Sequence, residues 1–112
     1  MRPAARTMAR LRSEGWTVDK VEHWNQWAKK RIDLFHFLDL LAIRGDGPKR
    51  GILGVQCCGR DFTWHIKKIT AEPKAVIWLQ AGARIEIWGW RKLKAGWRPR
   101  IEEITIDYFD IS

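Results

Sequence analysis

Two polar side chains lie inside apolar segments of this sequence, where an unpaired polar group is costly. Asp39 lies within Phe35 to Ile43 (FHFLDLLAI), and Gln56 lies within Ile52 to Cys58 (ILGVQCC). If these segments are neighbouring strands, both side chains can share one face and bring their oxygens together at the open end of a sheet. Oxygen donors suit Mg²⁺ or Mn²⁺, and a bound metal beside a positive side chain suits phosphodiester hydrolysis. Asp39 and Gln56 are therefore candidate metal ligands and candidate catalytic residues.

Each of these residues also has a plainer interpretation. Asp39 can reach solvent at a strand end or pair with an arginine. Lys67 and Lys68, in the helix expected over Arg60 to Ala71, can stabilise a phosphate or form a solvated helix face. His65 can act as a general base, or it can be an ordinary surface or core histidine.

The composition predicts one globular domain, residues 1–112, with a polyanionic partner. The chain has 112 residues and a formal charge of +8, and basic chains favour nucleic acid. No apolar run is long enough to cross a membrane, and the start has no apolar signal segment. Adjacent Cys57 and Cys58 rarely form a disulfide and predict a reducing, cytoplasmic location. We expect Cys58 to be a small buried thiol.

Periodicity predicts an α/β domain. Helices are expected over 3–14, 60–71 and 74–81; strands over 16–22, 35–43, 52–58, 84–90 and 101–106; a loop over 23–32; and a basic turn over 92–100. The two apolar strands, 35–43 and 52–58, are expected to pair as a hairpin.

This order of elements resembles the PD-(D/E)xK, or restriction-endonuclease-like, nuclease superfamily over roughly Ala5 to Trp90. The likeness is greatest to its Holliday-junction-resolvase-like branch and to small phage-type proteins. The family carries an Asp on its second core strand and (D/E)xK on its third. Asp39 matches the Asp, and Gln56-Cys57-Cys58 occupies the place of (D/E)xK. The resemblance implies a restriction-endonuclease-like core, a central mixed sheet of about five strands flanked by helices.

The family pattern also has departures here. Cys58 stands where the family has its lysine, and the resemblance implies that Lys67 or Lys68 supplies the positive charge instead. Glu22 or Glu14 would complete the metal shell. Asp33 can approach the site from the preceding loop.

The resemblance therefore implies a Mg²⁺-dependent (or Mn²⁺-dependent) DNA endonuclease with a degenerate active site, selective for branched DNA such as a Holliday junction. It also implies a homodimer and an intracellular, phage-encoded protein. Two alternatives stay open. One is a non-catalytic nucleic-acid-binding module of the same fold, and the other is a phage-borne structural or interaction protein whose tryptophans pack on another subunit.

Basic residues are expected to track a nucleic-acid backbone, positioning it without reading its sequence. Several tryptophans adjoin the later groups and can stack on bases or pack in the core. The expected binding residues are Arg6, Arg10, Lys29, Lys30, Arg31, Arg60, Arg91 and Lys92.

Overall fold

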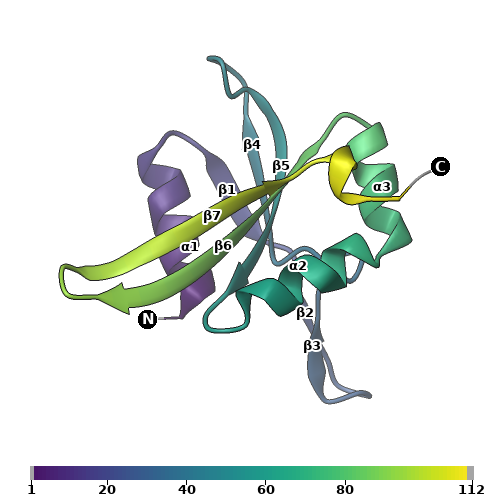
Figure 1. Ribbon diagram of the computed structural model, residues 1–112, viewed down its shortest axis with the longest axis horizontal. Coiled ribbons are helices and arrows are strands. Elements are labelled where there is room, and N and C mark those ends of the chain that lie inside the picture. The colour runs from purple at the N-terminus through teal and green to yellow at the C-terminus, as the bar shows by residue number, and fades with distance from the viewer. Residues whose placement is uncertain (1, 111–112) are drawn as a thin grey trace.

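Five strands form one mixed sheet in the part of the chain that the computed structural model describes, residues 2–110 (Figure 1). In chain order they are β1 (Thr17–Lys20), β4 (Leu40–Arg44), β5 (Gly51–Cys58), β6 (Arg84–Leu93) and β7 (Gly96–Ile104), which is also their order across the sheet. Only β5 and β6 run parallel; the other neighbours are antiparallel. The predicted mixed sheet is confirmed, whereas its restriction-endonuclease-like identity stays a prediction.

Helices cover both faces of this sheet (Figure 1). Helix α1 (Pro3–Ser13) packs on one face, and α2 (Phe62–Thr70) and α3 (Pro73–Gln80) pack on the other. The last two helices form the crossover that parallel strands require between β5 and β6. A short 3₁₀ turn, η1 (Ile106–Tyr108), follows β7. Within residues 2–110, no helix has both the length and the apolar character needed to span a membrane.

Alternation along the strands divides the core into two apolar clusters, one for each face of the sheet. The α1 cluster consists of Leu11, Trp16, Val18, Leu40, Ala42, Leu53, Val55, Trp88 and Trp90. The α2–α3 cluster consists of Phe37, Leu38, Cys58, Phe62, Ile69, Ala75, Ile85, Ile87 and Ile104. The sheet is therefore buried on both faces at its centre.

The segment 23–32, expected to be a loop, is a hairpin that projects from the body of the protein (Figure 1). It consists of β2 (His23–Asn25) and β3 (Lys30–Ile32), which pair antiparallel. The Asn25 Oδ1 accepts hydrogen bonds from the N–H groups of Trp27 and Ala28, both at 2.9 Å. This side-chain turn, together with a left-handed Lys29 at φ 51°, reverses the chain.

Two further predictions about strands were wrong. The segment from Phe35 is a turn with left-handed Phe35 and His36, at φ 53° and 71°, and β4 begins only at Leu40, so Asp39 directly precedes the strand. The basic segment 92–100 is mostly strand, because β6 and β7 continue into a long hairpin. Pro99 fits within β7 because this is an edge strand with one unpaired side. The other predicted elements agree with the structure apart from their ends.

Candidate acidic metal centre

Three carboxylates converge where the small hairpin meets the central sheet. Glu22 follows β1, Asp33 follows β3 and Asp39 precedes β4. One oxygen of each lies within 4.8 Å of the others, close enough for a single ion to contact all three. Asp39 is buried, with 7 % of its surface exposed, and the other two are partly buried. The structure thus joins acids from separate segments into one site.

Asp39 and Gln56 face each other, as the adjacent-strand interpretation expected. Asp39 Oδ2 accepts hydrogen bonds from Gln56 Nε2 and from the Cys57 backbone N–H, both at 2.8 Å. The Gln56 Oε1 is buried and has no hydrogen-bond partner within residues 2–110. An unpaired buried carbonyl is unusual and leaves one oxygen free for a ligand.

Lys68 supplies the cation of the site. Its Nζ lies 3.2 Å from Asp33 Oδ2 and 5.7 Å from the centre of the Trp64 ring. Lys67 is exposed and does not line the acidic cavity, and Glu14 pairs instead with Arg10 at 2.9 Å. Of the alternatives left open by the sequence, the structure therefore brings Lys68 and Glu22 to Asp39, and it places Lys67 and Glu14 elsewhere.

The surroundings of Asp39 disfavour its negative charge. Burial, followed by a hydrogen bond with Asp33, raises the pKa of Asp39 to about 8, although the Cys57 N–H acts in the opposite direction. The negative charges of Asp33 and Glu22 raise this pKa further. Negative charges this close repel one another and are stabilised by a nearby cation. Lys68 and the Arg31 guanidinium, which lies 3.5 Å from Glu22, neutralise only part of this negative charge.

The donor set fits a hard divalent ion. Three carboxylates and the free Gln56 carbonyl provide only oxygen, which is what Mg²⁺ and Mn²⁺ prefer. A dipositive ion would also offset the repulsion that raises the pKa of Asp39. The residues that would hold such an ion are Glu22, Asp33, Asp39 and Gln56.

The acidic cavity, of about 300 Å³, lies between two basic hollows. It shares Pro3 with one hollow of about 490 Å³. It shares Asp33 and Lys68 with another of about 370 Å³. The first hollow is lined by basic and aromatic side chains: Arg6, Arg60, Trp90, Arg91, Lys92 and Trp97. The second includes Lys30 and Arg31.

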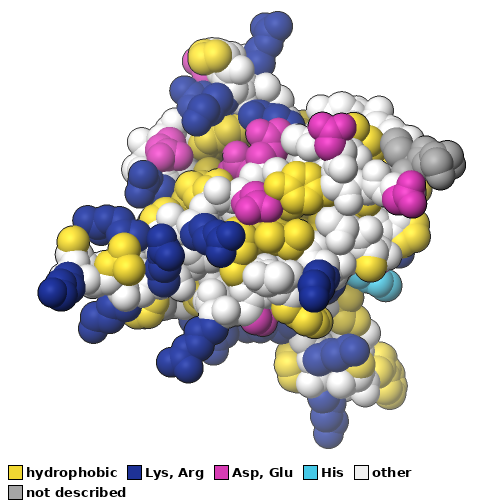
Figure 2. Space-filling model, viewed as in Figure 1, with side chains coloured by type: hydrophobic (Ala, Val, Ile, Leu, Met, Phe, Trp, Pro, Cys, Tyr) yellow, Lys and Arg dark blue, Asp and Glu magenta, His cyan; other side chains and the backbone are white. Residues whose placement is uncertain are grey.

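The remaining expected binding residues lie apart from these hollows. Arg10 is engaged with Glu14, and Lys29 sits in the turn of the β2–β3 hairpin. Figure 2 shows Lys and Arg side chains along the β6–β7 hairpin and also on the β2–β3 and β4–β5 hairpins. Trp97 is partly exposed under the Arg6 guanidinium, 4.5 Å from its ring centre, whereas Trp88 and Trp90 are buried in the core.

Sequence reasoning missed two features of this region. The N–H group that binds Asp39 belongs to the backbone of Cys57, so the residue type at this position could not predict the contact. The second feature is that His65 lies beside Cys58 and Asp61. Asp61 and His65 are one helical turn apart, and this spacing could have indicated that their side chains lie close together.

Comparisons of the chain with protein-family models, with curated proteins and with solved structures found no match.

Proposed function

We propose that this protein is a Mg²⁺-dependent endonuclease that acts on DNA. The observation that carries the proposal is the meeting of three carboxylates, Glu22, Asp33 and Asp39, within 4.8 Å of one another beside a lysine. An acidic metal-binding group next to a cation is the arrangement that phosphodiester hydrolysis requires. Basic hollows on both sides of it offer positively charged contacts for a polyanionic strand.

The chain's own residues would divide the chemistry between them. A bound Mg²⁺ supplies Lewis-acid polarisation of the phosphate and activation of water. Glu22, Asp33, Asp39 and the Gln56 carbonyl would hold the ion, and the Gln56 N–H and Cys57 N–H fix the Asp39 carboxylate in position. Lys68 offsets the negative charge that develops on the phosphate as water adds and one P–O bond breaks.

The basic hollows account for binding. Arg6, Arg60, Arg91 and Lys92 gather beside the acidic cavity and can contact successive phosphates. Such contacts position a backbone and carry little sequence information. A preference for DNA, for branched DNA and for action as a homodimer rests on the resemblance seen in the sequence, and each stays a prediction.

A non-catalytic nucleic-acid-binding module is the second candidate. The observation that favours it is Gln56, which places a neutral amide where the resembling family has a carboxylate. Its Nε2 also donates to Asp39 Oδ2, so one Asp39 oxygen is engaged within the protein. Both features weaken the attraction of the site for a metal ion.

Cleavage of end-labelled linear and branched DNA with Mg²⁺ or Mn²⁺ tests the proposal. The wild-type protein should cut, and Asp39→Ala should lower the cleavage rate at least about 100-fold. This loss is larger than the usual effect of removing a residue that only hydrogen-bonds to a metal ligand. Lys68→Ala should also lower it about 100-fold, as removal of a charge-stabilising donor does. The matched controls are Lys67→Ala, which is exposed, and Asp46→Asn, whose side chain is 91 % exposed in the β4–β5 loop. Both controls should keep wild-type activity.

Other outcomes decide against catalysis. Cleavage that survives Asp39→Ala contradicts the metal site. A wild-type protein that binds DNA with a steep salt dependence but never cuts is the binding module. A protein that neither cuts nor binds supports the structural or interaction role.

A further inference from the structure

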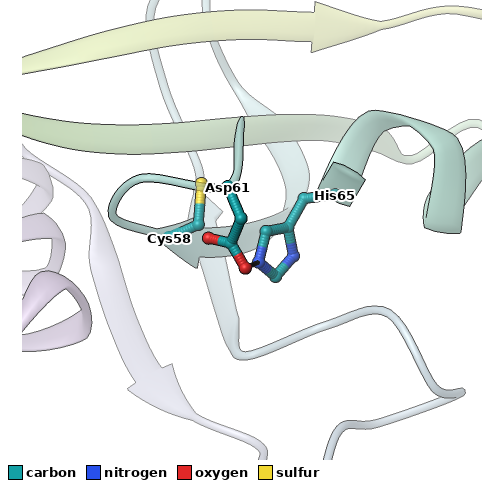
Figure 3. Close-up of side chains that lie close together, drawn as sticks. All are labelled: Cys58, Asp61 and His65. Atoms are coloured by element: carbon teal, nitrogen blue, oxygen red, sulfur yellow. Dashed lines mark ion pairs between the residues drawn. The ribbon is translucent and has the colours of Figure 1, made fainter. Parts of the chain in front are cut away.

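A second side-chain cluster lies between β5 and α2, outside the carboxylate group. Cys58 ends β5, Asp61 precedes α2, and His65 lies one helical turn further on. Figure 3 shows these three side chains gathered in the space between the strand end and the helix. One ligand atom of each, a sulfur, an oxygen and a nitrogen, lies within 4.8 Å of the other two.

The Asp61 carboxylate turns toward this cluster instead of capping its helix. An Asp before a helix normally accepts a hydrogen bond from a first-turn N–H, but Asp61 makes no such bond. Its Oδ2 lies 3.2 Å from His65 Nε2. The carboxylate therefore leaves the helix end and points to the other potential ligands.

The other two side chains are mostly buried. Cys58 is 4 % exposed, and the His65 side chain is 12 % exposed. Burial lowers the pKa of His65, which favours the neutral form of the ring, and this form can ligate a metal. His65 Nε2 faces Asp61 and is therefore the nitrogen available to the cluster, while Nδ1 is buried and has no hydrogen-bond partner within the described residues.

The donor chemistry selects the ion. Thiolate and imidazole are ligands of Zn²⁺ and similar transition metals, not of Mg²⁺. The thiolate and the carboxylate would balance a dipositive ion, and a neutral group is the least costly to bury. The Asp61 side chain is 58 % exposed, so an ion can reach the cluster from solvent and keep water as a fourth ligand.

We propose that Cys58, Asp61 and His65 bind a transition-metal ion of the Zn²⁺ class, which fastens the first turn of α2 to the end of β5. The site differs from the acidic Mg²⁺ site in its donors, although His65 also lines the acidic cavity and α2 also carries Lys68. Binding converts the Cys58 thiol to a thiolate and releases its proton to solvent. This proposal does not depend on nuclease activity.

Titration of the purified, metal-free full chain with Co²⁺ tests the site, because cobalt thiolate bonds absorb in the near ultraviolet. We expect one equivalent of Co²⁺ to produce this absorption, and Zn²⁺ to abolish it by displacement. Cys58→Ser should remove the band, whereas Cys57→Ser, the matched control at the neighbouring position, should retain it. Co²⁺ held by carboxylates alone gives no thiolate band, so the two sites are distinguished.

The exposed ligand provides a variant that does not disturb the core. Asp61→Asn should weaken Co²⁺ binding at least about tenfold while leaving the far-ultraviolet circular dichroism unchanged. Zn²⁺ should raise the Tm of the wild type and of Cys57→Ser, but not that of His65→Gln. The proposal is overturned if the wild type shows no thiolate band, or if the band follows Cys57 instead of Cys58.

Discussion

Replacing Asp39 with Asn is expected to stabilise the protein at pH 8 when divalent ions are absent. Asparagine has nearly the shape of aspartate but carries no charge. Its Oδ1 can accept the Cys57 N–H, which is 2.8 Å from Asp39 Oδ2. In that position the same Oδ1 also accepts from Gln56 Nε2, which is 2.8 Å from Asp39 Oδ2. The variant therefore removes a disfavoured charge and keeps both hydrogen bonds.

The pKa of Asp39 sets the size of this effect. Burial, chiefly, raises it from 3.8 to about 8. At about 1.4 kcal/mol per pH unit, the full difference corresponds to an upper limit of roughly 6 kcal/mol. The cavity beside Asp39 is open to water, and Lys68 lies near, so relaxation reduces the penalty. We expect Asp39→Asn to gain about 2 kcal/mol at pH 8.

The pH dependence has a definite sign. Between about pH 4 and pH 8 the folded protein retains a proton on Asp39 that the unfolded chain has lost. The folded state then binds more protons than the unfolded state, so the stability of the wild type falls as pH rises through this range. Below pH 4 Asp39 is protonated in both states and the term vanishes. The advantage of the variant should grow from pH 4 to pH 8.

Urea unfolding of both proteins at several pH values in EDTA measures this difference. Other titrating groups are common to the two proteins and cancel in the comparison. Asp46→Asn, at an exposed loop position, should change stability by less than about 0.5 kcal/mol at every pH. Adding Mg²⁺ should stabilise the wild type more than Asp39→Asn. A variant that is less stable than the wild type at pH 8, or equally stable throughout, would show that the buried Asp39 charge does not destabilise the fold.

Two further predictions concern binding and packing. Arg91→Ala and Lys92→Ala should each reduce the slope of log K against log salt for DNA binding by about 1, as measured by fluorescence anisotropy. The control Lys74→Ala, on α3, should leave this slope unchanged, and equal effects from all three variants would argue against a defined basic hollow. Gly54→Ala should destabilise the fold by about 1–3 kcal/mol in urea unfolding, because its added Cβ would meet the Leu38 and Trp78 side chains. The control Gly45→Ala, where no atom lies within 4 Å, should have little effect, and an unaltered Gly54→Ala protein would contradict this packing.

Most elements of the fold could be predicted because apolar periodicity is a direct consequence of burial. The alternation in Arg84 to Trp90 and the apolar run of Ile52 to Cys58 both lie in strands of the structure. Left-handed Phe35 and His36 could not be predicted, because only a few per cent of residues other than glycine adopt that conformation. An apolar run through a turn looks like a strand when the turn is itself buried, as Phe37 and Leu38 are here.

The part of the site that depends on which strands are adjacent could be predicted from the sequence. The part that depends on how α2 is rotated about its axis could not. Asp39 and Gln56 lie opposite each other because their segments are adjacent in the sheet. The choice between Lys67 and Lys68 depends on a rotation of about 100° along α2, and the sequence alone does not fix how that helix is turned. Packing of Phe62 and Ile69 in the core sets this rotation and points Lys68 to the acids.

The same packing explains how a destabilising acid is held in place. Asp39 lies between side chains that are fully buried on either side of it, namely Phe37, Leu38 and Leu40. Each such side chain stabilises the fold by about 1.5–3 kcal/mol, so together they exceed the penalty of roughly 2 kcal/mol expected for the Asp39 charge. Asp39 is therefore held both by its buried neighbours and by the hydrogen bonds from Gln56 Nε2 and the Cys57 N–H. A carboxylate held in this way cannot move away from Asp33 and Glu22, and a divalent ion can relieve their repulsion while they stay in place.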